Sequence, residues 1–361
     1  MKQLEGRKVQ KVGYSTMAVS LPAEWVKRNN IKPSDLVFLV QEKDGTLKVL
    51  PSHIAQREEA EEYIINVDAC DEHGMLKRII IGSYILGRDV IRITSSSRIG
   101  KEHIDEVRGV VPRLMGLGIL EETPKNILLQ CSIDPTKFKL DMLVRRLSII
   151  STTILSEAMQ AFLENNKSLA EEAIGREEGA NTIYYLAVRL LLSAQAKTEI
   201  AEQIGVDDIV LIPAVRLVLQ CLELIADYSQ DIAKKIIELQ ANWDKLPKDV
   251  IERIYHLGEL SQTVFQKAVD CTFTRDLRIA NGVIEMKGVV DEEADRLTRE
   301  LPQVPYLRAI VSSLNKIADI GAIIAEVAIN SALREPGKYV ENIINIVKHE
   351  RTVPLQTKKA K

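Results

Sequence analysis

The sequence predicts a multidomain α+β protein, in which a short β-hairpin module and a small α/β domain precede two tandem three-helix bundles. Three observations lead to this fold class. β-branched runs between turn residues fill the first 50 residues, strands and helices alternate from about residue 60, and helical apolar recurrence continues from residue 139 almost to the end. The expected domains are 1–51, 60–135, 139–242 and 247–345, followed by a basic tail at 346–361.

Composition limits the class of protein. The chain has 361 residues, 46% hydrophobic and 27% charged but only 4% aromatic, so aliphatic side chains must fill several cores. No uninterrupted apolar run approaches the roughly 18–20 residues of a membrane span, and the start "MKQLEGRKVQ" lacks the apolar segment of a signal peptide, so we expect a cytoplasmic protein. The four cysteines are far apart and show no C-x-x-C spacing, which favours reduced structural thiols.

The N-terminal module is built from short strands and turns. "RKVQKVG" and "TMAVSLP" are expected strands, Pro22 precedes a short helix, and "DLVFLVQEKDGTLKVLP" is an expected hairpin that turns at Asp44-Gly45. The net charge of −3 is unevenly distributed, because residues 1–50 hold nine Lys/Arg and five Asp/Glu, an excess of +4 that leaves −7 for the rest. The basic excess favours a polyanionic partner for this module.

The run "KVGYSTMAVSLPAEW" and the Asp-Gly hairpin resemble the AbrB/SpoVT swapped-hairpin domain. The resemblance implies that two copies interlock into a homodimer that binds DNA. Phosphate contacts are then expected from the basic side chains of the module. An open alternative is that these charges only solubilise a dimerisation unit, and the strand pattern alone does not choose between them. The candidate DNA-binding residues are Arg7, Lys8, Lys11, Lys27 and Arg28.

The second domain reads as strand, helix, strand, helix and strand: "EEYIINVD", "DEHGMLKRIIIGSYILG", "DVIRITSS", a helix from Gly100 to Gly118 interrupted at Pro112, and "NILLQCSI". Backbone N–H groups at Ser95–Ser97, Arg98 and Gly100 are a possible anion site, although a plain loop and helix cap is the favoured interpretation. A solvated loop is likewise favoured over a metal site for a group of four side chains: Asp68, Asp71, Glu72 and His73.

Each of the two bundles contains an unusual acidic stripe. In "LELIADYSQDI", Glu223, Asp227 and Asp231 are spaced four apart on an expected helix, and each like-charge pair at that spacing costs about 0.2–0.5 kcal/mol. The stretch "LNKIADIGAII" repeats the pattern 92 residues later, with Asn315 and Asp319 in place of Glu223 and Asp227. The two stretches therefore indicate a duplicated bundle.

The middle helix of each bundle also carries an oxygen-bearing pair at a spacing of four. These pairs are Glu177 with Asn181 and Asp291 with Asp295. Carboxylate and amide oxygens on facing helices suit hard or borderline cations, and a bound cation would offset the repulsion within the stripe.

The L-E-x-I-A-D-x-x-x-x-I-A run and its copy resemble the PhoU family, and with the front hairpin the whole chain resembles archaeal-type PhoU proteins that carry an AbrB domain. The resemblance implies two three-helix bundles with metal-binding E/D-x-x-x-D motifs and a divalent or ferric ion (iron, manganese or magnesium). Two carboxylates of the fuller motif are amides here, and Tyr228 and Ile320 stand where the family often has histidine, so a merely solvated acidic stripe stays open as the alternative. The implied metal-binding residues are Glu177, Asn181, Glu223, Asp227, Asp291, Asp295, Asn315 and Asp319.

The leading functional hypothesis is a regulator of phosphate uptake, in which a DNA-binding dimer is coupled to a metal-binding PhoU-like sensor that controls phosphate transport. The alternative is a scaffold or inhibitor that binds a phosphate-transporter subunit or a kinase through its bundles, with the hairpin only dimerising. No catalytic residues are expected, because the sequence has no P-loop, nucleophile elbow or dinucleotide fingerprint, and the histidines are scattered away from the acidic pairs.

Overall fold

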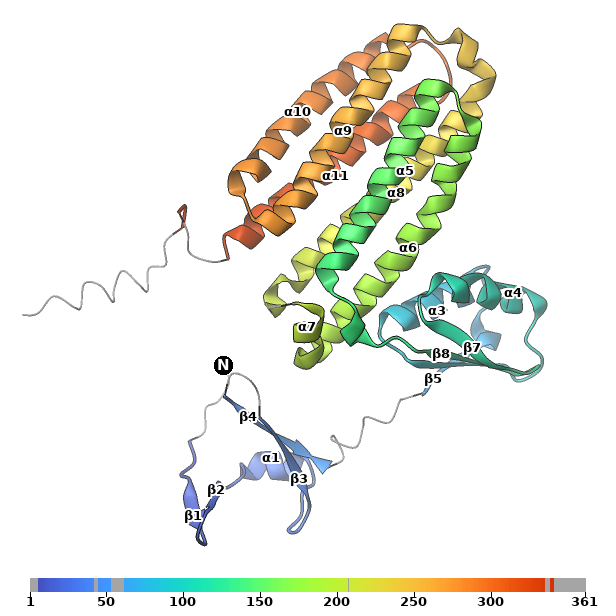
Figure 1. Ribbon diagram of the computed structural model, residues 1–361. Helices are drawn as coiled ribbons and strands as arrows, with labels where there is room; N and C mark the ends of the chain where they lie inside the picture. The colour runs from blue at the N-terminus through green and yellow to red at the C-terminus, as the bar shows by residue number, and fades with distance from the viewer. Residues whose placement is uncertain (1–5, 42–44, 53–61, 207, 335–337, 341–361) are drawn as a thin grey trace, which may run out of the picture. The chain divides into compact units, whose positions relative to one another are not determined.

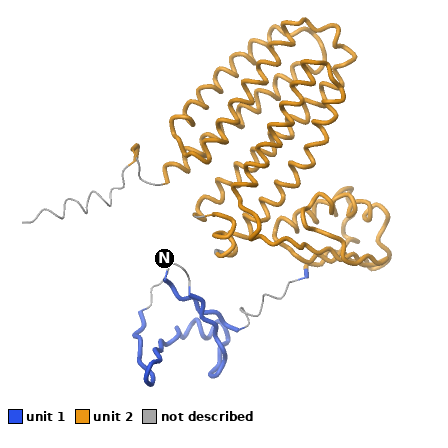
Figure 2. The backbone as a smooth tube through the Cα atoms, in the orientation of Figure 1, with its two compact units in different colours: residues 1–62 blue, residues 63–361 orange. Residues whose placement is uncertain are grey.

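The computed structural model describes residues 6–41, 45–52, 62–206, 208–334 and 338–340 (Figure 1). The chain divides into two compact units, Met1–Glu62 and Tyr63–Lys361 (Figure 2). The predicted basic tail at 346–361 lies outside the described residues, and so does Asp44 of the predicted hairpin turn. The predicted fold class is confirmed, with hairpins first, a small sheet domain next and helical bundles last.

The first unit, which we call the head, consists of two hairpins and one short helix: β1 Gln10–Val12, β2 Thr16–Ala18, α1 Ala23–Arg28, β3 Val37–Gln41 and β4 Leu47–Pro51. β1 pairs antiparallel with β2, and β3 with β4. The first hairpin turns through Gly13, whose φ of +70° is in the left-handed region that favours glycine. Apart from Pro51, none of the described side chains in residues 6–52 is buried. A single copy of the head therefore has no apolar core.

The second unit begins with a four-stranded sheet in the order β5-β6-β8-β7. Two helices supply one wall of its core, in which Ile80, Tyr84, Ile91 and Leu129 are fully buried. The elements of this α/β domain are β5 Glu62–Asn66, α3 Met75–Ile85, β6 Val90–Thr94, α4 Lys101–Val110, β7 Leu117–Glu122 and β8 Asn126–Cys131.

The predicted helix from Gly100 to Gly118 is wrong in its second half. α4 ends at Val110, a single 3-10 turn follows over Val111–Arg113, and the chain then enters β7, which pairs antiparallel with β8. The reason is local: the proline in that turn has no N–H to donate, and Gly116 adopts a φ of +75°. The domain therefore has one strand more than the sequence pattern predicted.

The first bundle contains the three predicted long helices and one short extra helix, namely α5 Leu140–Glu164, α6 Lys167–Ala196, α7 Thr198–Ile204 and α8 Ile212–Leu239. Two asparagines set the α5–α6 turn. Asn165 ends α5 with a left-handed φ of 52°, and the side chain of Asn166 caps α6 by accepting from the backbone N–H of Leu169.

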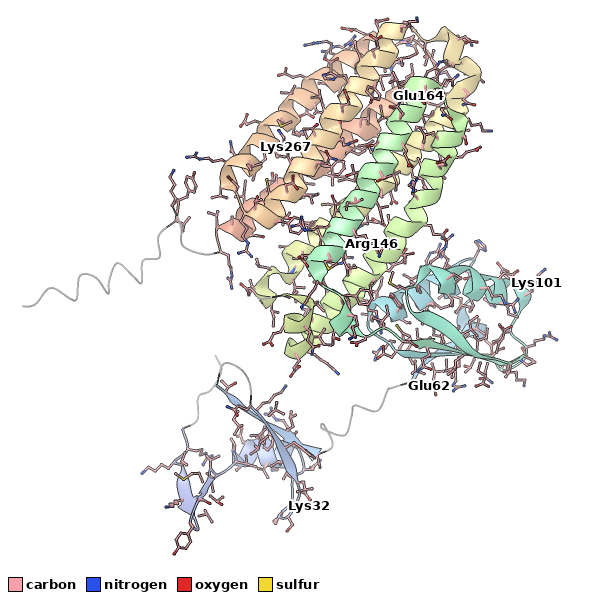
Figure 3. The ribbon with its side chains drawn as sticks, viewed as in Figure 1. Lys32, Glu62, Lys101, Arg146, Glu164 and Lys267 are labelled. Carbon is pink, nitrogen blue, oxygen red and sulfur yellow. The ribbon has the colours of Figure 1, made fainter. Side chains whose placement is uncertain are left out.

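The second bundle contains α9 Lys248–Thr274, α10 Leu277–Glu300 and α11 Leu307–Ala332. Both bundles lie side by side with their helices along a common direction (Figure 1), and their buried apolar side chains form one cluster. Arg146 and Glu164 mark α5 in Figure 3, and Lys267 marks α9. α11 approaches α9 closely at Gly321, where an added Cβ would lie 3.0 Å from the Cα of Phe265.

One stretch of the chain, Ile209–Lys245, is long and apolar enough to cross a membrane by length and composition alone. No membrane span was expected from the sequence. The core helix of a folded bundle meets the same criteria, and α8 in this stretch buries its apolar side chains in the shared core of the two bundles. α8 also carries half-buried carboxylates, Glu223 and Asp227, which a lipid-exposed span rarely has.

A buried arginine of α6 ties the α/β domain to the first bundle. The Arg189 side chain is only 6% exposed, and its guanidinium donates to the carbonyl oxygens of Tyr84 at 2.5 Å and Arg88 at 3.2 Å. It also forms an ion pair with Asp89 and lies over the Tyr84 ring, 4.8 Å from its centroid. We call this group the Arg189 anchor.

Candidate metal centre and nucleic-acid interface

Three carboxylates on two neighbouring helices of the first bundle lie close enough for their charges to interact, although their oxygens are not all within 4.8 Å of one another. α6 supplies Glu177, and α8 supplies Glu223 and Asp227; all three side chains are half-buried. We call them the acidic triad. Burial, together with the negative charges of Asp227 and Glu177, raises the pKa of Glu223 from 4.5 to about 7. Burial and the charge of Glu177 likewise raise the pKa of Asp227.

The direct hydrogen-bond donors to the acidic triad are amide side chains, and cations lie one residue further out. Asn181 donates to Glu177, Gln230 donates to the same carboxylate at 3.3 Å, and Gln220 donates to Glu223 at 2.7 Å. Arg216 and Lys234 each contact one of these glutamines, Arg216 at 3.3 Å from Gln220 and Lys234 at 2.7 Å from Gln230. Among the residues that the structure describes, no ion pair involves a carboxylate of the triad.

The chemistry of this set fits a hard or borderline cation. Three carboxylates and the amide oxygen of Asn181 are oxygen ligands, and burial together with mutual repulsion raises the pKa values of Glu223 and Asp227 despite the nearby charges of Arg216 and Lys234. Asp231, the third acid of the stripe, is not part of the triad. It forms an ion pair with Lys235, one turn further along α8.

The second bundle arranges its acids around a lysine instead. The Nζ atom of Lys287 lies 2.6 Å from Asp291 and 3.0 Å from Asp319. Hydrogen bonds to these two carboxylates raise the pKa of Lys287. Of the four predicted ligands, the structure brings Asp291 and Asp319 together around this lysine. Asp295 is exposed, and no described residue forms a hydrogen bond with the buried Oδ1 of Asn315.

Lys287 was missed by the sequence analysis, although a signal was present. The lysine precedes Asp291 by four residues, which is the spacing of an ion pair on a helix. In this arrangement an ammonium group lies between the two carboxylates. The assignment of all eight residues as metal ligands stays a prediction.

The five basic candidates for DNA contact all lie on the head and are all exposed. Arg7 and Lys8 precede β1, Lys11 is in the middle of β1, and Lys27 and Arg28 form the last turn of α1. Lys11 pairs in register with Met17 of β2. The structure makes these cations accessible, and their contact with DNA stays a prediction.

The possible anion site in the α/β domain is filled by a carboxylate of the protein. Asp68 accepts a hydrogen bond from the Ser95 hydroxyl at 2.6 Å and another from the Ser96 backbone N–H at 2.8 Å. These hydrogen bonds lower the pKa of Asp68 to about 2. The favoured interpretation of this segment as a capped loop therefore has a physical basis, because the donors already have an anionic partner.

A second group in the α/β domain has metal-ligand chemistry but a structural role. His73, Glu102 and Glu106 offer ligand atoms within 4.8 Å of one another. Both carboxylate oxygens of Glu106 accept from backbone N–H groups at the start of α3, those of Gly74 at 3.2 Å and Lys77 at 2.8 Å. Capping of α3 accounts for this carboxylate without a metal.

Comparisons with known proteins agree with this organisation. A family model described as the PhoU domain matches residues 144–236 and 254–347, more than half of the chain. A second model, described as "Antidote-toxin recognition MazE, bacterial antitoxin", matches residues 10–56. The crystal structure of PhoU from Pseudomonas aeruginosa is 20% identical, with a TM-score of 0.47, over 54% of this chain and 95% of that one. The search of curated proteins returned no match. This chain belongs to the PhoU family, with two PhoU repeats behind an N-terminal domain similar to MazE and AbrB.

Proposed function

We propose that this protein is a cytoplasmic, non-enzymatic regulator of phosphate uptake that binds DNA as a homodimer through its head and responds to a metal ion held by the acidic triad. Membership of the PhoU family supports the link to phosphate uptake, and the MazE-like head supports a nucleic-acid partner. The observation that carries the proposal is the exposed apolar surface of the head, because a second copy of the chain would cover it.

The lack of a core among the described residues of the head supports dimerisation. In a single head, Met17 is 67% exposed and Leu39 is 61% exposed, and Val12 and Phe38 are exposed as well. A piece of about 50 residues is only marginally able to fold alone, and a head with so little buried apolar area is below that margin. Interlocking with a second copy would cover both hairpins and would double the number of basic side chains on one particle. Two sets of exposed cations are what a DNA backbone requires.

The DNA-binding part is tested by removing two cations of the first hairpin. With Lys8 and Lys11 both changed to alanine, affinity for DNA upstream of the neighbouring genes should fall similarly for all sequences, and the salt dependence should flatten by up to about one unit per lost phosphate contact. Lys48→Ala is the matched control, because this exposed lysine lies on the other hairpin. Fluorescence anisotropy over a salt series, with and without inorganic phosphate, measures the effect.

Two results would contradict the proposal for DNA. An unchanged affinity and salt slope in the double variant would exclude a phosphate-contact role for Lys8 and Lys11. Binding of the wild type that never exceeds its non-specific level on any upstream fragment would favour a scaffold that uses the head only to dimerise.

For the metal, we infer that Glu177, Glu223 and Asp227, with the amide oxygen of Asn181, hold one divalent or ferric cation. The inference is supported by three partly buried carboxylates, none of which forms an ion pair with a described residue, and two of which have raised pKa values. A bound cation supplies the positive charge that these side chains lack. Because the pKa of Glu223 is about 7, binding near neutral pH displaces the proton that this carboxyl holds.

Thermal melts of the metal-free and metal-titrated protein test this site. Saturating manganese, iron or magnesium should raise wild-type stability by RT ln(1 + [L]/Kd), about 2.7 kcal/mol at a hundredfold excess over Kd. Asp227→Asn should lose most of this gain, while in the absence of metal it should be as stable as the wild type or a few tenths of a kcal/mol more stable. Asp231→Asn is the matched control, since Asp231 pairs with Lys235 outside the triad. Equal metal responses of wild type and Asp227→Asn would exclude the site.

A further inference from the structure

We propose that Lys287 fills the cation position of the second bundle and keeps metal ions out of it. The lysine lies on α10, between the carboxylate of Asp291 on the same helix and that of Asp319 on α11. It is thus a counter-ion built into the chain, at the place where the first bundle has only acids. The evidence for this proposal comes from the second bundle. It rests on the proposed function, a metal ion in the first bundle, only where the two repeats are compared.

The geometry leaves no room for an ion beside the ammonium group. A metal bound by both carboxylates would lie about 2–2.5 Å from an oxygen of each. The same oxygens are 2.6 Å and 3.0 Å from the Lys287 Nζ. The metal would therefore come within a few ångströms of a positive charge unless the lysine moved away. Lys287 is only 30% exposed, so its departure also requires its stem to leave a partly buried position.

Two positions account for the difference between the two repeats: Asn315 stands in place of Glu223, and a lysine stands in place of an alanine on the middle helix. Glu177 on α6 corresponds to Asp291 on α10, and four residues before each of them stand Ala173 and Lys287. Ala173 is fully buried and carries no charge. The first bundle therefore cannot neutralise its carboxylates from this position, whereas the second bundle does so with a lysine of i, i+4 spacing.

The charge balance supports the same conclusion. The acidic triad has a formal charge of −3 when all three carboxyls are ionised, whereas Lys287, Asp291 and Asp319 together amount to −1. The amide oxygen that stands in place of a carboxylate in the second bundle, the buried Oδ1 of Asn315, is a neutral ligand. A single amide oxygen next to an ammonium group does not compensate a divalent cation for its lost hydration.

Metal stoichiometry tests the proposal. Equilibrium dialysis against Mn²⁺, followed by elemental analysis, is carried out on the full-length wild type, Lys287→Ala and Lys287→Arg. We expect Lys287→Ala to bind one equivalent more than the wild type and Lys287→Arg to bind no more than the wild type, because arginine keeps the positive charge. The same substitutions are repeated in an Asp227→Asn background, which reports on the second bundle alone. There, Lys287→Ala should raise the bound Mn²⁺ from none to one equivalent, whether or not the first bundle of the wild type binds metal.

A metal-free measurement adds a readout that needs no ion. In the presence of EDTA, Lys287→Ala should melt at a lower temperature than the wild type, because Asp291 and Asp319 lose their counter-ion, and Lys287→Arg should restore most of the loss. A Lys287→Ala variant that folds but gains no Mn²⁺ overturns the proposal. The proposal is also overturned if Asp319→Asn, in an otherwise unchanged protein, binds one Mn²⁺ equivalent fewer than the wild type. The second bundle would then bind metal with Lys287 in place.

Discussion

Replacing Glu223 with glutamine should stabilise the metal-free protein at about pH 8 and leave it nearly unchanged at about pH 4. Burial and the charges of Asp227 and Glu177 raise the pKa of Glu223 from 4.5 to about 7 in the folded protein. Between these values the folded state holds a proton that the unfolded chain has released. The stabilising contribution of this proton is therefore complete below pH 4.5 and is lost as the pH rises through about 7.

The size of the effect follows from the pKa and the exposure of the side chain. Each pKa unit corresponds to about 1.4 kcal/mol, so the rise from 4.5 to about 7 sets an upper bound of about 3.4 kcal/mol. Glu223 is only half-buried, and solvent screening reduces the expected value to about 1–2 kcal/mol. Wild type with ionised Glu223 should be less stable than Glu223→Gln by this amount at high pH.

Urea unfolding in the presence of EDTA, repeated between about pH 4 and about pH 8, measures this difference. Glu285→Gln is the matched control, because Glu285 is an exposed glutamate on α10. Its stability curve should run parallel to that of the wild type. If the Glu223→Gln curve also runs parallel to the wild type over the whole range, Glu223 does not hold an extra proton in the folded state and the argument from the acidic triad fails.

Three further outcomes are expected from variants elsewhere. Arg189→Met should lower the unfolding free energy by about 1.5–3 kcal/mol in urea titrations, because the buried carbonyl oxygen of Tyr84 loses its charged donor; an unchanged midpoint would count against the anchor. Gly321→Ala should lower the free energy of unfolding by about 1–3 kcal/mol, because the added Cβ meets the backbone of α9. Gly258→Ala should lower it less, because there the added Cβ meets the flexible side chain of Met159. Phe38→Asp should yield monomers in light scattering, and a persistent dimer would exclude the exposed hairpin face as the interface.

Most of the helical fold was predictable from the sequence, because burial repeats with the helical period over long stretches. α5, α6 and α8 to α11 all lie within the predicted bundles. β7 was not predictable in the same way. Its residues follow a helical pattern without a clear gap, and the strand is specified by pairing with β8 across a register shift between Ile119 and Glu121, which is a tertiary contact.

The candidate site was predictable in part. The repeated L-x-x-I-A-D core located the acids, and the structure brings Glu177, Glu223 and Asp227 close enough to shift pKa values. The spacing of acids alone does not tell which cation compensates them. Lys287 looks like any solvated lysine in the sequence, and only the packing of α10 against α11 places its ammonium group between two carboxylates.

Through the Arg189 anchor, a movement of α6 would be passed on to the α/β domain. Glu177 and Arg189 are twelve residues apart on one uninterrupted helix, which corresponds to about 18 Å. Since a helix of this kind tilts or slides as a unit more readily than it bends, a change of charge that draws Glu177 toward α8 would move Arg189 as well. The carbonyls held by Arg189 belong to the end of α3 and the turn after it, so the whole sheet of the α/β domain would be displaced with them.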